Sequence, residues 1–304
     1  MSLLDRAIVS VLPAVPRGIV RRLSAPYIAG TELADARETV AVLNAAGQLA
    51  TVDVLGEEIR STGEARAIAE AYLEVLDAIA ADGLEANVSV KPTGLGLALG
   101  YDVCRENLEL IARRAADHGI FVRIDMEDSS TTDDTLRLYR ELLAGGYEKL
   151  GVVLQASLLR TLADAEALAA AGANVRLCKG IYVEPAELQF RDADAVRVNY
   201  VRVLETLLDA GCHVGIATHD DLLIEQGLRA VRERALDRDA YEFQMLLGVR
   251  AAAGARLVTD GHRLRIYVPF GRKWYEYSLR RLKENPKVAG YIAADTLGRL
   301  VPRR

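Results

Sequence analysis

The sequence is poor in aromatic residues and in cysteine. Aromatic side chains make up 6% of the 304 residues, so alanine, leucine and valine must supply most of the packing. The three cysteines are Cys104, Cys178 and Cys212, an odd number without the spacing of a metal site. We therefore expect free thiols in a reducing cytoplasm and no bound metal.

Long apolar runs are also missing. No run approaches the ~18 apolar residues that a transmembrane helix needs. The apolar stretch at the N-terminus contains Asp5 and is interrupted by Pro13 and Pro16, which fits a secretory signal poorly. Glu32 and Asp35 fit an organelle transit peptide equally poorly. The sequence therefore predicts a cytoplasmic protein.

Neither sign of charge dominates. Lysine and arginine total 38, aspartate and glutamate total 43, and the net charge is −5. Nucleic-acid-binding domains usually carry a clear basic excess, so this balance weighs against nucleic acid as a partner. Apolar residues, by contrast, reach 51% of the chain, which is enough for a large buried core.

Short runs rich in β-branched residues alternate with long amphipathic stretches. This alternation predicts parallel strands, each followed by a helix that covers the sheet. Eight such units predict an α/β fold, a closed (β/α)8 TIM-like barrel, and no G-x-G-x-x-G follows the first run. We predict the strands at residues 51–56, 87–92, 121–127, 151–156, 174–180, 213–219, 241–248 and 263–271.

The helical stretches lie between these runs. Ser61 should cap the first of them, and Thr131 with Asp134 forms a capping pattern before another. The segment GLGLALG (94–100) predicts a flexible lid or a turn. Residues 1–50 also look helical and precede the repeat, so we predict an N-terminal helical arm at 1–50 and the barrel domain at 51–304. The predicted helices after each strand are 61–83, 101–118, 131–144, 157–172, 187–211, 219–235, 248–258 and 271–284.

The carboxyl ends of the strands build the functional site in a barrel of this kind. Charged or hydrogen-bonding residues lie in or just after seven of the eight predicted strands, which is more than solvation of the strand ends requires. These residues are Lys91, Asp125, Glu127, Gln155, Arg176, Lys179, Thr218, His219, Glu242 and Tyr267.

A series of motifs surrounds these residues. In chain order they are SVKPTGLG, RIDMEDS, LQASLLRT, RLCKGIYVEP, ATHD, EFQMLLG, RIYVPFG and Y-x-x-R-R-x-x-E-N. Together they resemble the catalytic barrel of the proline dehydrogenase family over about residues 50–285. The resemblance implies a monofunctional enzyme that carries FAD on a barrel without a Rossmann domain.

The last motif contains two adjacent arginines, Arg280 and Arg281. On a helix they project about 100° apart, and two guanidinium groups can hold one carboxylate from two directions. The resemblance implies that they bind the carboxylate of L-proline. The alternative is an exposed helical face on which both arginines pair with Glu284.

The resemblance assigns four more residues to the substrate. Lys91 would contact proline, Asp125 would fix the substrate site through its charge, and Tyr182 and Tyr267 would shape the pocket around the proline ring. The alternatives are a simple ion pair between Lys91 and Asp125 across the barrel mouth, and core packing for either tyrosine.

The resemblance also assigns the cofactor site. It places Arg176 near the N5 atom of FAD, where a cation favours the anionic reduced flavin, so we assign catalytic roles to Arg176 and Asp125. The alternatives are a solvated strand-end charge for Arg176, a loop-bound amide for Gln155, and a structural His219 that Asp220 orients. The remaining FAD contacts that the resemblance implies are Ile124 (through its backbone), Gln155, Lys179, Gly180, Ile181, Thr218 and His219.

Two residues depart from the family pattern. Family members often have valine and alanine where this chain has Cys178 and Ile181. Ile181 is bulkier than alanine and would change the size of the pocket, whereas we expect the thiol of Cys178 to be buried and inert.

The resemblance implies oxidation of L-proline to Δ1-pyrroline-5-carboxylate, the first step of proline catabolism. Electrons would pass to a quinone, with peripheral contact at the inner face of the membrane. Two alternatives remain open. Another flavin barrel, similar to methylenetetrahydrofolate reductase, would need a larger cleft and not the Arg-Arg pair. A non-catalytic barrel that serves as a binding protein would keep only part of the motifs.

Overall fold

Eight parallel strands close into a barrel. The computed structural model describes residues 17–56 and 59–284. Each strand pairs with the next one in the chain, and β8 pairs with β1 to close the ring. The predicted (β/α)8 fold is therefore confirmed. The strands are β1 (Leu49–Val54), β2 (Ala86–Val90), β3 (Val122–Ile124), β4 (Leu150–Gln155), β5 (Asn174–Cys178), β6 (Val214–Ala217), β7 (Tyr241–Leu246) and β8 (Leu264–Phe270).

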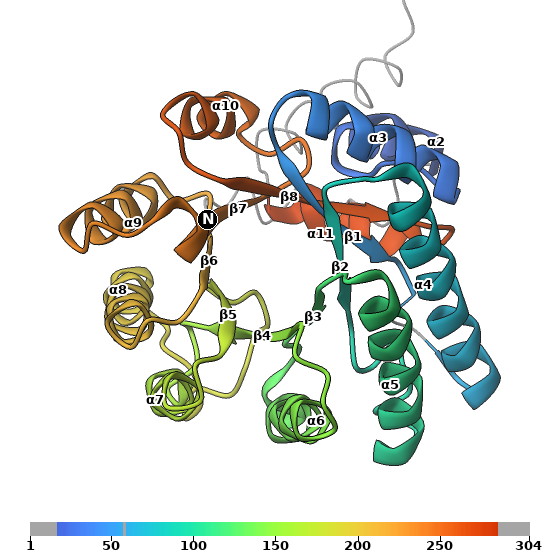
Figure 1. Cartoon of the computed structure of the whole chain (residues 1–304), viewed down its shortest axis with the longest axis horizontal. Helices are drawn as coiled ribbons and strands as arrows, with labels where there is room; N and C mark the ends of the chain where they lie inside the picture. Colours follow the sequence, from blue (N-terminus) through green and yellow to red (C-terminus); the bar gives the residue numbers. More distant parts are fainter. Residues whose placement is uncertain (1–16, 57–58, 285–304) are drawn as a thin grey trace, which may run out of the picture.

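Helices surround the barrel, one after each strand (Figure 1). The main hydrophobic core lies between this ring of helices and the outer face of the sheet. The helices are α2 (Arg17–Ser24), α3 (Leu33–Ala45), α4 (Thr62–Asp82), α5 (Tyr101–His118), α6 (Thr132–Ala144), α7 (Thr161–Ala169), α8 (Ala193–Asp209), α9 (Asp221–Glu233), α10 (Ala251–Thr259) and α11 (Trp274–Glu284), with short 3₁₀ turns η2 (Ala25–Tyr27), η3 (Ser129–Thr131) and η4 (Arg238–Ala240).

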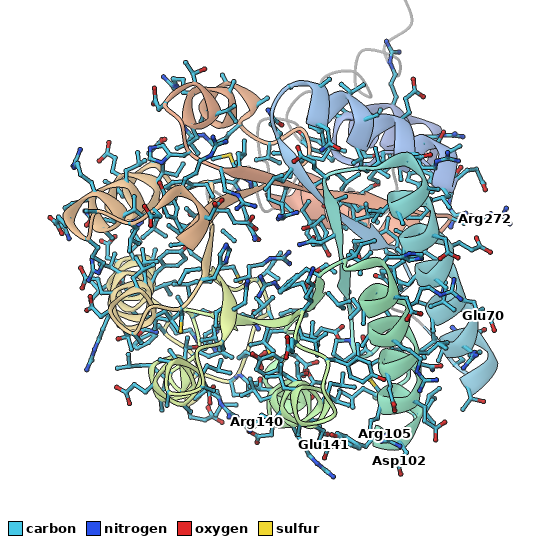
Figure 2. The ribbon with its side chains drawn as sticks, viewed as in Figure 1. Glu70, Asp102, Arg105, Arg140, Glu141 and Arg272 are labelled. Carbon is cyan, nitrogen blue, oxygen red and sulfur yellow. The ribbon has the colours of Figure 1, made fainter. Side chains whose placement is uncertain are left out.

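The outer surfaces of the helices are charged. Glu70 on α4 and Asp102 and Arg105 on α5 point away from the barrel in Figure 2. Nε of Arg105 lies 3.8 Å from Oδ1 of Asp102, almost one turn earlier on the helix. The opposite face of α5 buries apolar side chains such as Leu108 and Ile111. This division between the two faces explains why helical periodicity was visible in the sequence.

Helix α8 begins six residues later than the sequence predicted. The predicted helix at 187–211 is observed as α8, which begins at Ala193 because Asp192 caps it: its carboxylate accepts hydrogen bonds from the backbone N–H groups of Asp194 and Ala195. The residues before it form a loop that returns to the end of β4, where Leu158 and Gln189 make an isolated antiparallel bridge. This loop extends the wall at the carboxyl end of the barrel.

The two capping predictions have opposite outcomes. Ser61 caps α4 as predicted, since its side chain accepts a hydrogen bond from the backbone N–H of Glu64. Thr131 makes no side-chain cap, so that prediction was wrong. Its hydroxyl donates to the backbone carbonyl of Asp128, and the carboxylate of Asp128 caps the preceding turn η3 instead.

The cap on α4 gives a first testable prediction. Replacing Ser61 with alanine leaves the N–H of Glu64 without its acceptor, and we expect the free energy of unfolding to fall by about 1 kcal/mol. Urea denaturation measures this change. Thr131→Ala is the matched control, because Thr131 occupies an N-cap position without capping. Equal losses in the two variants would contradict the assignment of Ser61 as a cap.

The GLGLALG segment is a packed turn rather than a lid. Residues 92–99 form consecutive turns between β2 and α5. Leu95 is fully buried in the main core, and its backbone carbonyl accepts a hydrogen bond from Nδ2 of Asn107 on α5. This packing ties the segment to the body of the protein.

The two faces of the barrel strands differ in polarity. Alternate strand residues such as Val52, Val88 and Val152 are buried against the helices. The residues between them point into the barrel, where their side chains form hydrogen bonds across it. The interior of this barrel is therefore largely polar, whereas branched aliphatic residues dominate the interior of most barrels of this type. The polar interior residues of β1–β8 include Thr51, Asp53, Asn87, Ser89, Arg123, Asn174, Arg176, Glu242, Gln244, Arg265 and Tyr267.

The helices before β1 contact the last helix of the chain. Helix α2 packs against α11, and the guanidinium group of Arg17 lies 4.9 Å from the ring centre of Tyr275. A small cluster of Ile28, Leu55 and Tyr277 joins these elements to the barrel. The division of the chain at residue 50 stays a prediction. None of the helices in the described ranges has the length and apolar character needed to cross a bilayer.

Candidate active site

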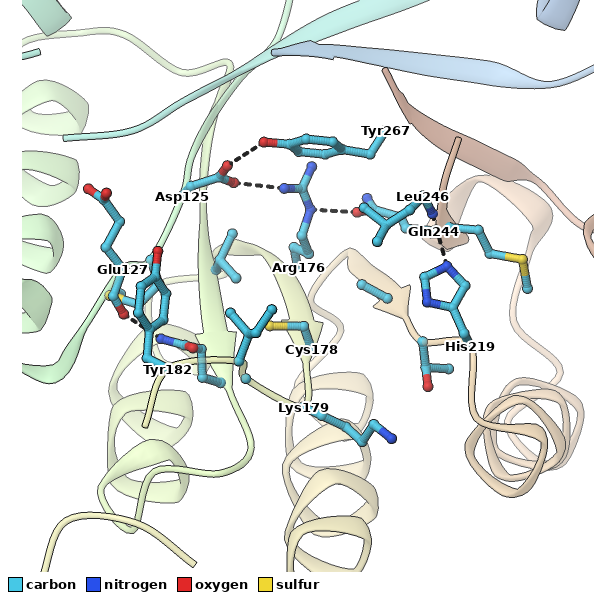
Figure 3. A pocket seen from close by; sticks show the side chains of 18 of the residues that line it. Asp125, Glu127, Arg176, Cys178, Lys179, Tyr182, His219, Gln244, Leu246 and Tyr267 are labelled. Atoms are coloured by element: carbon cyan, nitrogen blue, oxygen red, sulfur yellow. Dashed lines mark hydrogen bonds and ion pairs between the residues drawn. The ribbon is translucent and has the colours of Figure 1, made fainter. Parts of the chain in front are cut away.

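A cavity opens at the carboxyl ends of the barrel strands. Its volume is about 610 Å³, which lies within the range of small-molecule sites. Figure 3 shows side chains from several strands converging on it. The predicted site residues that line it are Lys91, Asp125, Gln155, Arg176, Lys179, Gly180, Ile181, Tyr182, Thr218, His219 and Tyr267.

Four sequence-based assignments are not placed in the cavity wall. Ile124 is fully buried in the main core and does not line the cavity, although Asp125 beside it does. Arg280 and Arg281 belong to α11, but their side chains lie outside the described residues. Glu242 was expected at a strand end, and this was wrong, because it is the second residue of β7 and does not line the cavity.

Asp125 and Arg176 form a buried ion pair in the cavity. Nη1 of Arg176 lies 2.7 Å from Oδ1 of Asp125, and Ser89 donates its hydroxyl to the same oxygen at 2.6 Å. Tyr267 donates its hydroxyl to Oδ2 of Asp125 at 2.9 Å (Figure 3). Burial raises the pKa of Tyr267 well above its ordinary value, so this hydroxyl keeps its proton. Three of the four residues belong to β2, β5 and β8, Asp125 directly follows β3, and their contacts fix the geometry of the site.

Lys91 binds a carboxylate that the sequence analysis missed. Its Nζ lies 2.6 Å from Oδ1 of Asp53, against 3.9 Å from Oδ2 of Asp125, so the predicted pair with Asp125 is the longer contact. Lys91 also donates to the hydroxyl of Tyr267 at 3.0 Å. Asp53 is fully buried, and the hydroxyl of Tyr72 lies 3.1 Å from the same Oδ1. A charged residue inside an apolar strand was the signal that could have identified Asp53.

Gln244 on β7 is a second residue that the sequence analysis missed. Its Oε1 accepts a hydrogen bond from Nε of Arg176 at 2.6 Å, and the residue lines the cavity (Figure 3). Among the described side chains, Nη2 of Arg176 has no hydrogen-bond partner, which leaves its two N–H donors available to a ligand. Strand alternation places Gln244 and Glu242 on one face, but the sequence alone does not tell which face points inward.

The loop after β5 passes close to the end of β4. Gly180 has a φ of +95°, which favours glycine, and a β-carbon there would collide with Oγ of Ser157. Gln155 is buried and donates its amide to the backbone carbonyl of Glu127 at 2.7 Å, as the loop-bound alternative predicted. Ile181 is 43% exposed, so its extra bulk lies at the rim of the cavity.

The residues after β6 have separate partners. Nε2 of His219 accepts the backbone N–H of Leu246 at 3.0 Å, which leaves the ring proton on Nδ1. Asp220 accepts hydrogen bonds from Lys179 at 3.1 Å and from Arg197 at 2.9 Å. The alternative in which Asp220 orients His219 stays a prediction. Burial opposes the ionisation of Asp220, but its two basic partners hold its pKa below the ordinary value.

The cysteines form no disulfide, as expected. Cys178 lines the cavity, and burial raises the pKa of its thiol to about 11, so the thiol is not a reactive nucleophile. No group of three or more metal-ligating side chains occurs in the described part of the chain. The cavity therefore offers cations, an ion-paired carboxylate and apolar walls such as Val153 and Ala217. Such a site suits a small molecule with one anionic group and an apolar ring.

Sequence comparisons match this chain to proteins of one kind. The family model described as proline dehydrogenase matches residues 36–294. Proline dehydrogenase of Deinococcus radiodurans is 35% identical over 279 residues, which cover 90% of each chain. Proline dehydrogenase 1 of Bacillus subtilis (strain 168) is 36% identical over 271 residues, which cover 89% of each chain.

Structural comparisons agree on the fold. Proline utilization A (PutA) of Bdellovibrio bacteriovorus, solved after inactivation by N-propargylglycine, aligns with a TM-score of 0.83 at 24% identity. A PutA variant of Bradyrhizobium japonicum aligns with a TM-score of 0.72 at 23% identity. These alignments cover 92% and 88% of this chain, but only 36% and 32% of the PutA chains. The chain thus spans about a third of these larger proteins.

Proposed function

The chain belongs to the proline dehydrogenase family, and from this premise we propose that it oxidises L-proline to Δ1-pyrroline-5-carboxylate with bound FAD. The predictions of the family and of an oxidoreductase of this kind are confirmed by the matches. The structural observation that carries the finer proposal is the cavity in which Asp125 and Arg176 form a buried ion pair beside Lys91 and Tyr267.

The residues of the cavity fit the ring system of FAD. Arg176 and Gly180 line the cavity, where the guanidinium group and the backbone of the loop would meet the ring. Val153, Ala217 and Met245 supply apolar walls for a flat aromatic group. When bound, FAD supplies the two-electron oxidation of the substrate. We assign its other contacts to Gln155, Lys179, Ile181, Thr218 and His219, which line the same cavity, and to the backbone of Ile124.

The substrate is held by charge at one end and by apolar contact at the other. We assign the carboxylate of proline to Arg280 and Arg281, with Lys91 beside it. Asp53 and the hydroxyl of Tyr267 position the ammonium group of Lys91. Tyr267 and Tyr182 line the cavity where the proline ring would pack. Holding a flexible reactant in one orientation is itself a large part of catalysis.

Arg176 contributes through its charge. Reduction of the cofactor increases its negative charge, and a fixed guanidinium group at that position stabilises the product state. Asp125 keeps Arg176 in place through the 2.7 Å ion pair. We further propose that the electrons leave to a quinone, and that the protein is cytoplasmic and meets the inner face of the membrane peripherally, as in the family that it resembles. This reaction would begin proline catabolism.

An absorption spectrum tests the proposed function. The purified protein, supplied with FAD, should show a flavin spectrum that bleaches when L-proline is added without oxygen. D-proline is the matched control, because it places the same groups in the mirror-image arrangement. A flavin spectrum that L-proline leaves unchanged would remove proline as the substrate, and failure to bind FAD would remove the cofactor.

A further inference from the structure

Glu242 and Arg265 lie outside the cavity but are connected to Arg176. Glu242 on β7 is 3% exposed, and its Oε1 accepts a hydrogen bond from Nε of Arg265 on β8 at 2.7 Å. The same oxygen accepts a hydrogen bond from Nε2 of Gln244 at 2.6 Å. Oε1 of Gln244 then accepts from Nε of Arg176. An unbroken chain of hydrogen bonds thus runs from Arg265 through Glu242 and Gln244 to Arg176.

The chain has a direction that Glu242 sets. A carboxylate only accepts hydrogen bonds, so it selects the NH2 end of the Gln244 amide and turns the carbonyl end toward Arg176. The reverse orientation would set the NH2 group of Gln244 against the N–H of Arg176, two donors facing each other. Burial opposes the ionisation of Glu242, but Arg265 lowers its pKa to about 2, so it stays an acceptor throughout the neutral range.

The space around Gln244 is equally restricted. Gly215 on β6 lies opposite Glu242 in the register of the two strands. A β-carbon on Gly215 would collide with Nε2 of Gln244. The glycine is therefore needed for room, because its backbone has no positive φ. The Gln244 amide therefore packs directly against the backbone of the neighbouring strand at Gly215.

We propose that Glu242 is a positioning residue for Arg176: with Arg265, it fixes the Gln244 amide in the orientation that accepts the Nε–H of Arg176 and so sets the position of this cation in the cavity. The proposal rests on the proposed function, in which Arg176 lies against the flavin. Asp125 and Ser89 hold Nη1 of the same guanidinium group from the other side. Arg176 is thereby held at two nitrogens, and in the proposed function Nη2 remains for the cofactor.

The test compares two variants that disturb Gln244 in different ways. Glu242→Gln removes the charge that orients the amide. Gly215→Ala displaces the amide and leaves the Glu242–Arg265 pair intact, so it covers the case in which Glu242→Gln fails to fold. We expect both to lower kcat roughly 10-fold to 100-fold, with a small change in KM, because a cation displaced by about 1 Å loses much of its effect. We also expect the midpoint potential of bound FAD to become more negative.

Thr51→Val is the matched control. Thr51 is a fully buried interior residue whose hydroxyl bonds to Asn87, away from Gln244 and Arg176. The Thr51→Val variant should have a lower melting temperature but an unchanged midpoint potential of bound FAD. A purely structural role for Glu242 predicts that Glu242→Gln behaves as Thr51→Val does, and that result would overturn the proposal.

A double variant tests whether Glu242 acts through Gln244. Gln244→Met removes both hydrogen bonds of the amide. If Glu242 acts through Gln244, adding Glu242→Gln to the Gln244→Met variant should lower kcat by no more than about a further twofold. If the losses of kcat from the two substitutions multiply in the double variant, the proposal is overturned. The midpoint potential needs no substrate, so it reports on the proposal even if L-proline fails to reduce the wild-type protein. A wild-type protein that binds no FAD would refute both the proposed function and the positioning role of Glu242.

Discussion

Replacing Arg176 with methionine should lower kcat/KM for L-proline by roughly 10²-fold to 10³-fold, because it removes the fixed positive charge at the developing negative charge of the cofactor. Methionine has a similar length but no hydrogen-bond donors. Asp125 would lose its 2.7 Å partner, and Gln244 would lose the donor to its Oε1. Steady-state kinetics and the midpoint potential of bound FAD measure the effect.

Arg160→Met is the control for Arg176→Met. Arg160 is also an arginine with two carboxylate partners, Asp133 and Asp164, but it does not line the cavity. It should therefore leave kcat/KM close to the wild-type value. Arg176→Lys should recover little activity, because an ammonium group lacks the planar fork that bonds to Gln244 and Asp125 at once. A fully active Arg176→Met variant would rule out the electrostatic role.

Replacing Lys91 with methionine should have the largest effect on stability. Asp53 is fully buried, and the substitution removes the ammonium group 2.6 Å from its Oδ1. Removing one partner of a buried ion pair is strongly destabilising, so we expect a loss of about 3 kcal/mol in the free energy of unfolding. Urea denaturation measures this loss, and affinity for a non-reactive proline analogue should fall with it.

Lys179→Met provides the comparison for Lys91. The side chain of Lys179 is 44% exposed on the rim of the same cavity and pairs with Asp220 at 3.1 Å. An exposed pair contributes little, so this variant should lose less than about 1 kcal/mol. If Lys91→Met were as stable as Lys179→Met, the charge of Asp53 would have to be compensated without Lys91.

The fold could be predicted because its signals are local. β-branched runs, helical periodicity and glycines at helix ends each occupy a few consecutive residues. Even so, β3 spans Val122–Ile124, shorter than the predicted 121–127, because its polar end turns away from the ladder into the cavity wall. Helix α8 started late for a similar reason, since Asp192 decides its first turn. Boundaries depend on single hydrogen bonds that periodicity does not reveal.

Arg176 and Tyr267 lie inside β5 and β8 and were assigned through the family resemblance, whereas other site residues could be predicted because they directly follow a strand. Lys91 and Lys179 were found in this way. Asp53 and Gln244 lie inside strands, and their place in the site depends on which face closes inward. Glu242 was assigned to the wrong end of the barrel for the same reason. Direct contacts between strands far apart in sequence, such as Asp125 with Arg176, come from the closed barrel and not from any local pattern.

The polar interior of the barrel also bears on how the chain reaches its native state. Arg123 lies on β3 and Asp125 directly follows it, while their partners Asn174 and Arg176 lie on β5. A half-barrel of β1–β4 that closed on itself would bury both side chains without these partners, at a cost of several kcal/mol. A closed half-barrel of β5–β8 would likewise bury Arg176 without Asp125. The charges inside thus favour all-or-none closure, and they oppose the assembly of this fold from independently folded halves.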